Sequence, residues 1–130
     1  MTDEELAAEF ESCRLPNELF RHRDHLQLAF FYLRRYGRDA ARSRIQESIL
    51  RYATANGAAH KYHVTITLVW MDLLEHAARR LPREATIVDL LEANPHLLTK
   101  TALEEYYSKE LLASDTARTS FVEPDLKPLA

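Results

Sequence analysis

The stretch HLQLAFFYLRRYG, residues 25–37, decides the fold class of this chain. Its apolar side chains recur at helical spacing, and Gly37 follows the last of them, in the position that often ends a helix. The same periodicity dominates the rest of the sequence, which has only two glycines and no segment with the clean alternation of a β-strand. The sequence therefore predicts an all-α protein. The stripe of this first helix consists of Leu26, Ala29, Phe30, Leu33 and Tyr36.

Two longer helices are predicted next along the chain. The first of them starts at Asp39, a favourable N-cap, and runs to Gly57; the next runs from about Ala59 to Arg80. The β-branched residues 64–67 would suit a strand, but the flanking apolar stripe continues at helical spacing, so a helix is favoured.

In the last third of the chain, the sequence predicts shorter helices. Thr86 and Asp89 form a capping box for a helix that ends near Ala93. Residues 1–16 are expected to be a lead-in segment, and residues 121–130 an extended tail that holds to the core. Further short helices are expected near Thr99 or Thr101, Ser108 and Ser114, and the apolar anchors of the tail are Phe121, Leu126 and Leu129. The whole is expected to be a single-domain bundle of about five helices.

Composition narrows the function classes. The 130 residues are 46% hydrophobic and 28% charged, as in soluble globular proteins, and the net charge of −3 gives no overall attraction to nucleic acid or anionic membrane. Nine arginines lie between residues 14 and 51, and a solvated, dipolar surface is favoured there over a nucleic-acid face, because no nucleic-acid-binding motif accompanies them. The single cysteine, Cys13, excludes an intrachain disulfide. With no signal peptide or membrane-spanning run, we expect a cytoplasmic protein, with a homodimer as a plausible assembly.

Two histidine pairs share one spacing, His22 with His25 and His60 with His63. Residues three apart lie on one face of a helix, so each pair can present two imidazoles to the same side. Tight turns at Gly37 and Gly57 make the first three predicted helices run up, down and up, which brings both pairs to one end of the bundle.

Four converging imidazoles indicate a site for a divalent transition metal, and zinc, iron and copper all suit such ligands. With three protein ligands, an open position could hold water or dioxygen, as in a metal-dependent enzyme acting on a small molecule. Candidate carboxylates for catalysis are Glu123 and Asp125 on the tail, which could fold back over the pocket. His76 and His96 are assigned to no site.

The same residues permit a second interpretation without metal. The side chains Arg21, Arg23 and Lys61, with Tyr62 as a wall, would make an anion-binding pocket at helix starts, where the backbone carries partial positive charge. The protein would then be a non-enzymatic helical module that binds a small anionic ligand or a protein partner. Electrostatics do not choose between the two interpretations.

Several segments resemble a family of small uncharacterised bacterial proteins. They are residues 20–37, the Lys-Tyr-His-Val-Thr run at residues 61–65, Asn94 with Pro95, Tyr107 with Ser108, and the closing Phe-Val-Glu-Pro-Asp-Leu at residues 121–126. The resemblance covers roughly residues 18 to 129 and implies a bacterial protein, but it brings no activity with it. Where relatives often carry a glutamate after the histidine that matches His63, this chain has Val64, so that acid is absent here.

Overall fold

The computed structural model describes residues 1–129, without the side chain of Lys100. Within these residues there are seven α-helices, four short 3₁₀ helices and no strand, so the all-α class is confirmed and the expected number of about five helices was too low. None of these helices is long and apolar enough to cross a membrane. The chain divides into two compact units, Met1–Tyr62 and His63–Ala130, and each is described by itself. The expected single domain stays a prediction.

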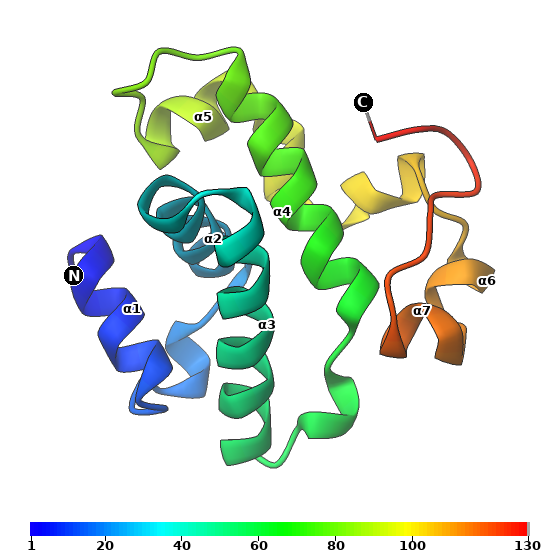
Figure 1. Cartoon of the computed structure of the whole chain (residues 1–130), viewed down its shortest axis with the longest axis horizontal. Coiled ribbons are helices and arrows are strands. Elements are labelled where there is room, and N and C mark those ends of the chain that lie inside the picture. Colours follow the sequence, from blue (N-terminus) through cyan, green and yellow to red (C-terminus); the bar gives the residue numbers. More distant parts are fainter. Residues whose placement is uncertain (130) are drawn as a thin grey trace. The chain divides into compact units, whose positions relative to one another are not determined.

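The first unit is a three-helix assembly of α1 (Asp3–Glu11), α2 (His22–Tyr36) and α3 (Arg38–Ala55), in which each helix packs against the other two (Figure 1). The 3₁₀ turns η1 (Asn17–Leu19) and η2 (Ala59–Lys61) complete it. Helix α2 ends at Gly37, whose φ of +82° is a conformation that glycine adopts without strain, as predicted. The apolar stripe of α2 faces inward, and the largest buried side chains of the unit include Phe10, Leu26, Leu28, Tyr32 and Ile45.

Helix α1 occupies most of the expected lead-in segment, residues 1–16. Thr2 and Glu5 form a reciprocal capping box, with Thr2 N donating to Glu5 Oε1 at 2.9 Å and Glu5 N donating to Thr2 Oγ1 at 3.1 Å. Leu6, Ala7 and Phe10 are buried, so the helix supplies one wall of the core.

The second unit is built around α4 (Val64–Arg79), followed by α5 (Ile87–Ala93), η3 (Pro95–Leu98), η4 (Lys100–Glu105), α6 (Lys109–Leu112) and α7 (Asp115–Thr119). Helix α4 begins at Val64 and not near Ala59, so the predicted start was five residues early and His60 lies outside this helix. The predicted caps Thr86, Ser108 and Ser114 are confirmed, each with a side-chain oxygen that accepts a backbone N–H three residues on.

The tail after α7 has no helix or strand and is fixed to its own unit by side-chain hydrogen bonds. Thr65, which is fully buried, donates from Oγ1 to Ser120 O at 2.9 Å and accepts from Val122 N at 3.2 Å. Tyr107 Oη donates to Val122 O at 2.6 Å. Leu126 is 56% exposed, so it is not the apolar anchor that the sequence suggested. Polar contacts to α4 and Tyr107 therefore fix the first part of the tail.

Candidate functional site

His22 and His25 both lie within the first turn of α2. Helix α2 starts at His22, and Asp24 in its first turn accepts the backbone N–H of Arg21 at Oδ2, at 2.9 Å. That carboxylate is therefore used at the helix start. His25 is half-buried with its ring centroid 6.0 Å from that of Phe20, at the edge of an aromatic cluster. The other members of the cluster are Phe10 and Tyr52.

His63 has a structural task in the second unit. It is the N-cap of α4, and its Nδ1 accepts the backbone N–H of Ile66 at 3.1 Å. Because Nδ1 is the acceptor, Nε2 carries the proton, and it donates to the carbonyl of Leu112 at 2.7 Å. Both ring nitrogens are thus engaged, and coordination of a metal through either one would replace a hydrogen bond that fixes the start of α4.

The remaining histidine of the predicted set, His60, is exposed on η2 in the first unit. Within residues 1–129, and leaving out the side chain of Lys100, no group of three or more His, Cys, Asp or Glu side chains is arranged to hold a metal ion. The convergence of the two histidine pairs, and the metal itself, stay predictions.

The predicted anion-binding side chains near these histidines make mainly local contacts. Arg21 Nε donates to Glu18 O at 3.3 Å, and Arg23 Nη1 donates to Gln27 Oε1 at 3.4 Å. Lys61 is exposed, and Tyr62 is half-buried, with burial raising the pKa of its hydroxyl.

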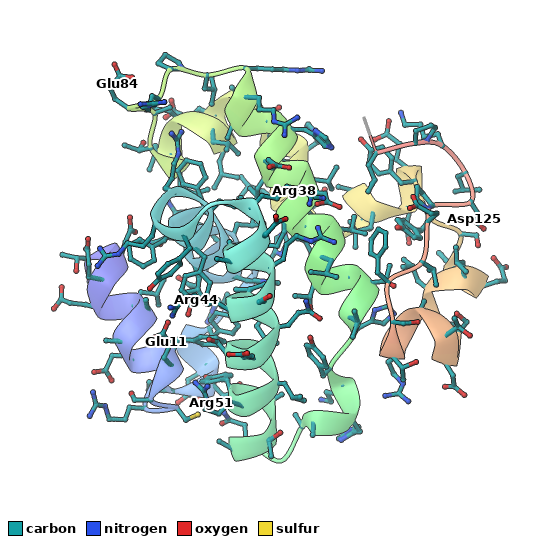
Figure 2. All side chains as sticks on the ribbon, viewed as in Figure 1. Glu11, Arg38, Arg44, Arg51, Glu84 and Asp125 are labelled. Carbon is teal, nitrogen blue, oxygen red and sulfur yellow. The ribbon has the colours of Figure 1, made fainter. Side chains whose placement is uncertain are left out.

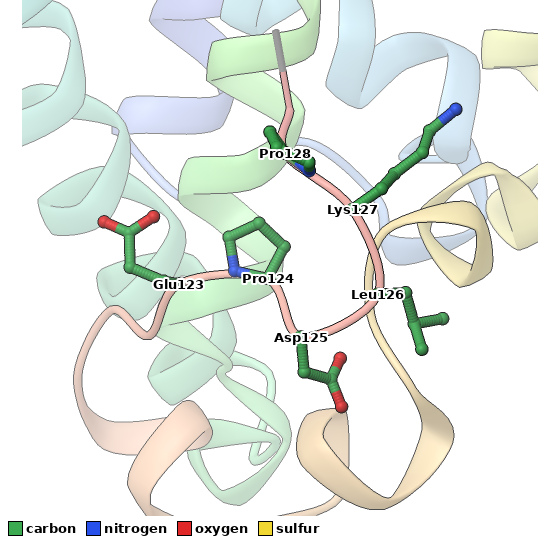
Figure 3. A pocket seen from close by; sticks show the side chains of 6 residues that line it. All are labelled: Glu123, Pro124, Asp125, Leu126, Lys127 and Pro128. Carbon is green, nitrogen blue, oxygen red and sulfur yellow. The ribbon is translucent and has the colours of Figure 1, made fainter.

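The two predicted catalytic carboxylates lie on the tail. Together with Pro124, Leu126, Lys127 and Pro128, they line an open hollow of about 310 Å³. Figure 3 shows that Glu123 and Asp125 point to different sides of the chain, so they do not form a pair. Asp125 uses both carboxylate oxygens on Ser108, accepting from its N at 2.8 Å and its Oγ at 2.6 Å, and these bonds lower the pKa of Asp125. Asp125 therefore anchors the tail, while Glu123 is exposed.

The arginine-rich segment is largely exposed and engaged with its own unit. Arg38, Arg44 and Arg51 lie along α3 (Figure 2). The Arg44 guanidinium lies 4.0 Å from the centroid of the Tyr36 ring, and Arg51 Nη1 donates to Glu11 O at 3.2 Å. These contacts agree with the favoured interpretation of a solvated surface.

A small cavity in the second unit collects polar side chains that the sequence assigned to no site. Its volume is about 130 Å³, and it lies between the last turns of α4, the segment around η3, Tyr106 and the end of the tail. We call it the α4–η3 pocket. It is lined by Leu73, His76, Ala77, Arg80, Asn94, His96, Leu97, Tyr106 and Leu129.

The polar groups of this pocket are mainly hydrogen-bond donors or cations. Arg80 carries a permanent positive charge, and two imidazoles, His76 and His96, add up to two more when protonated. Asn94 Nδ2 donates to Leu90 O at 3.0 Å, which fixes the amide at the pocket wall. No Asp or Glu side chain is among the described residues that line the pocket.

Two carboxylates next to lining residues have partners within this unit. Glu75, beside His76 on α4, lies 3.5 Å from the guanidinium of Arg79. Glu105 accepts a hydrogen bond from Lys127, and this contact lowers the pKa of Glu105. The pocket thus combines fixed and titratable positive charge over an apolar floor, a combination suited to a small anion.

The part of the pocket that lies on α4 could have been predicted from the sequence. Leu73, His76, Ala77 and Arg80 follow the spacing i, i+3, i+4, i+7 and therefore share one face of α4. His96 joins them only because the chain folds back after α5, and no local spacing predicts that.

Comparison with known proteins adds no assignment: the chain matches no protein-family model, and searches of curated proteins and of solved structures return no match. The resemblance to a bacterial family stays a prediction.

Proposed function

We propose that this protein is a helical module that binds a small anionic ligand in the α4–η3 pocket. The observation that carries the proposal is that half-buried His76 and exposed Arg80 and His96, from two elements, line one cavity whose described lining includes no carboxylate. Anion binding was the second function inferred from the sequence. Its support in the structure comes from the residues of the α4–η3 pocket, and not from Arg21, Arg23 and Lys61, which the sequence suggested for it.

The size of the pocket limits the ligand. Drug-sized ligands occupy pockets of about 300–1,000 Å³, whereas a water molecule takes up about 30 Å³ in the liquid. A cavity of about 130 Å³ is therefore smaller than a drug-sized pocket and suits one small anion. Sulfate, phosphate and short carboxylates are of this size.

Isothermal titration of the whole chain with sodium sulfate at pH 6 tests the proposal. A charge-assisted hydrogen bond contributes about 1.5–3 kcal/mol, so Arg80→Gln should weaken binding by about 10- to 100-fold. The matched control is Arg79→Gln, which removes the neighbouring guanidinium, whose partner is Glu75 and which does not line the pocket. Equal losses in the two variants, or no binding of sulfate, phosphate or acetate to the wild type, would contradict the proposal.

A metal-dependent function is a second proposal, supported by the position of His22 and His25 one turn apart at the start of α2. It would use His22 and His25, with or without His60 and His63, to bind zinc, iron or copper. A cytoplasmic location, a bacterial origin and a homodimer are likewise proposals from the sequence.

A further inference from the structure

We infer that anion binding in the α4–η3 pocket is coupled to protonation of His76 and His96, so that the pocket takes up its ligand below neutral pH and releases it above. This inference rests on the proposed function and describes the regulation of the same site. It follows from the kind of cation that lines the cavity: one guanidinium and two imidazoles, and no lysine among the described lining residues.

The positive charge of the pocket depends on pH because of this composition. Histidine is the side chain whose ordinary charge change falls between pH 5 and 8, while arginine stays charged throughout. Arg80 therefore supplies its charge throughout this range, whereas the two imidazoles are side chains of the kind that can gain a proton when an anion binds beside them.

Charged groups on α4, on η4 and on the tail lie near the two imidazoles, and those on α4 include Asp72, which is buried one turn before His76. On α4, Glu75 and Arg79 form an ion pair, which leaves Arg80 as the permanent charge at the pocket. On η4, Glu105 interacts electrostatically with His96.

The tail supplies the cation that balances Glu105. Lys127 binds the Glu105 carboxylate, and its ammonium lies 5.2 Å from the centroid of the Tyr106 ring, which lines the pocket. Neither member of this pair changes charge between pH 5 and 8, because the contact lowers the pKa of Glu105 and raises that of Lys127. This ion pair therefore adds no change of charge of its own in this range.

The direction and size of the effect follow from linkage. An anion beside an imidazole favours the protonated ring, and by reciprocity the protonated ring favours the anion. An opposite charge within about 4–6 Å commonly shifts a pKa by one unit or more, and one unit corresponds to a tenfold change in affinity. The affinity should therefore fall about tenfold for each imidazole, or about a hundredfold for both, between pH 5.5 and 8.

Sulfate is the appropriate probe because it keeps its two charges over this range, whereas phosphate takes up a proton within it. We would measure the sulfate dissociation constant of the whole chain by isothermal titration at pH 5.5, 6.5, 7.2 and 8, at constant ionic strength. The ring proton shifts of the histidines, recorded by NMR with and without sulfate, report which imidazoles gain protons on binding.

Four variants make the result specific. His76→Gln and His96→Gln should each reduce the pH dependence to about tenfold, and the double variant should remove it while Arg80 keeps weak binding. His60→Gln, which removes an exposed imidazole of the first unit, should keep the wild-type profile.

The outcomes separate the two proposals. Sulfate binding that varies less than twofold between pH 5.5 and 8 would overturn the coupling and leave the anion site intact. A pH dependence that survives in the double variant would also overturn it, since other groups would then be responsible. No sulfate binding even at pH 5.5 would overturn both.

Discussion

Removal of the His63 side chain should destabilise the start of α4 whether or not a metal is present. The ring joins two elements that are 49 residues apart in sequence, since Nδ1 accepts from Ile66 N at 3.1 Å and Nε2 donates to Leu112 O at 2.7 Å. His63→Ala removes both bonds at once. Alanine cannot replace the first, because it has no side-chain acceptor for the open N–H groups of the helix start.

The expected loss can be worked out bond by bond. Replacing a side-chain N-cap by alanine costs about 0.5–2 kcal/mol, and a hydrogen bond contributes a net amount of about 0.5–1.5 kcal/mol. His63→Ala should therefore lower the free energy of unfolding by about 1–3.5 kcal/mol. His63→Asn keeps an acceptor for Ile66 N but is too short for Leu112 O, so it should lose about 0.5–1.5 kcal/mol.

The assay is urea unfolding followed by circular dichroism, in buffer with a metal chelator. His60→Ala is the matched control, because this imidazole is exposed and its loss should change stability by less than about 0.5 kcal/mol. If His63→Ala is as stable as His60→Ala in chelator, the two hydrogen bonds do not hold the helix. The same comparison is repeated with zinc, iron or copper in place of the chelator. If His63→Ala is less stable than the wild type only when metal is present, His63 acts as a metal ligand and the structural account is refuted.

Three further predictions concern the metal, the tail and the acid range. Elemental analysis of protein purified without an affinity tag or chelator should find about one transition metal per chain if the metal proposal holds, and the His25→Ala, His63→Ala double variant should lose it. Thr65→Val should lower the free energy of unfolding by about 1–3 kcal/mol and speed amide exchange at Val122, because a buried hydroxyl loses two hydrogen bonds. The contact of Asp125 with Ser108 should hold the tail fully above pH 3.8, the ordinary pKa of the Asp125 carboxyl, and be lost as the pH falls below the lowered pKa of this carboxyl in the folded protein. Amide exchange at Leu126 should therefore become faster at that acidic pH. In Asp125→Asn it should already be faster at neutral pH.

The predictions for Thr65 and Asp125 each have a matched control within the chain. Thr67→Val removes a hydroxyl that bonds only within its own helix, to His63 O at 2.8 Å, and should cost less than Thr65→Val. Glu123→Gln changes an exposed carboxylate on the same tail and should leave exchange at Leu126 as in the wild type. If Thr65→Val and Thr67→Val cost the same stability, or if Asp125→Asn and Glu123→Gln change amide exchange at Leu126 equally, the corresponding prediction is contradicted. The metal prediction is contradicted if the purified protein contains no transition metal and binds none when metal is added.

What the sequence predicted well are features that depend on a few consecutive residues. The end of α2 at Gly37 and the helix starts after Thr86, Ser108 and Ser114 are all local matters of backbone conformation or capping. The same kind of signal, Thr2 with Glu5, marks α1 and could have been used. The fold class followed from periodicity for the same reason.

The features that sequence reasoning missed depend on distant residues. The late start of α4 follows from His63 as its cap, and that ring is oriented by Leu112, which no spacing near residue 63 predicts. Likewise, His76 and His96 are 20 positions apart and form no repeated pair, yet both line the α4–η3 pocket. A count of histidine spacings detects imidazoles that share a helix face but cannot detect those that meet through a turn of the chain.

This difference also bears on which histidines can respond to their surroundings. An imidazole whose two nitrogens already accept and donate, as in His63, must give up a bond before it can bind a metal or gain a proton. His76 and Arg80, by contrast, line a cavity with room for a small anion. For that reason the α4–η3 pocket, and not the more conspicuous histidine pairs, is where a ligand should be sought first.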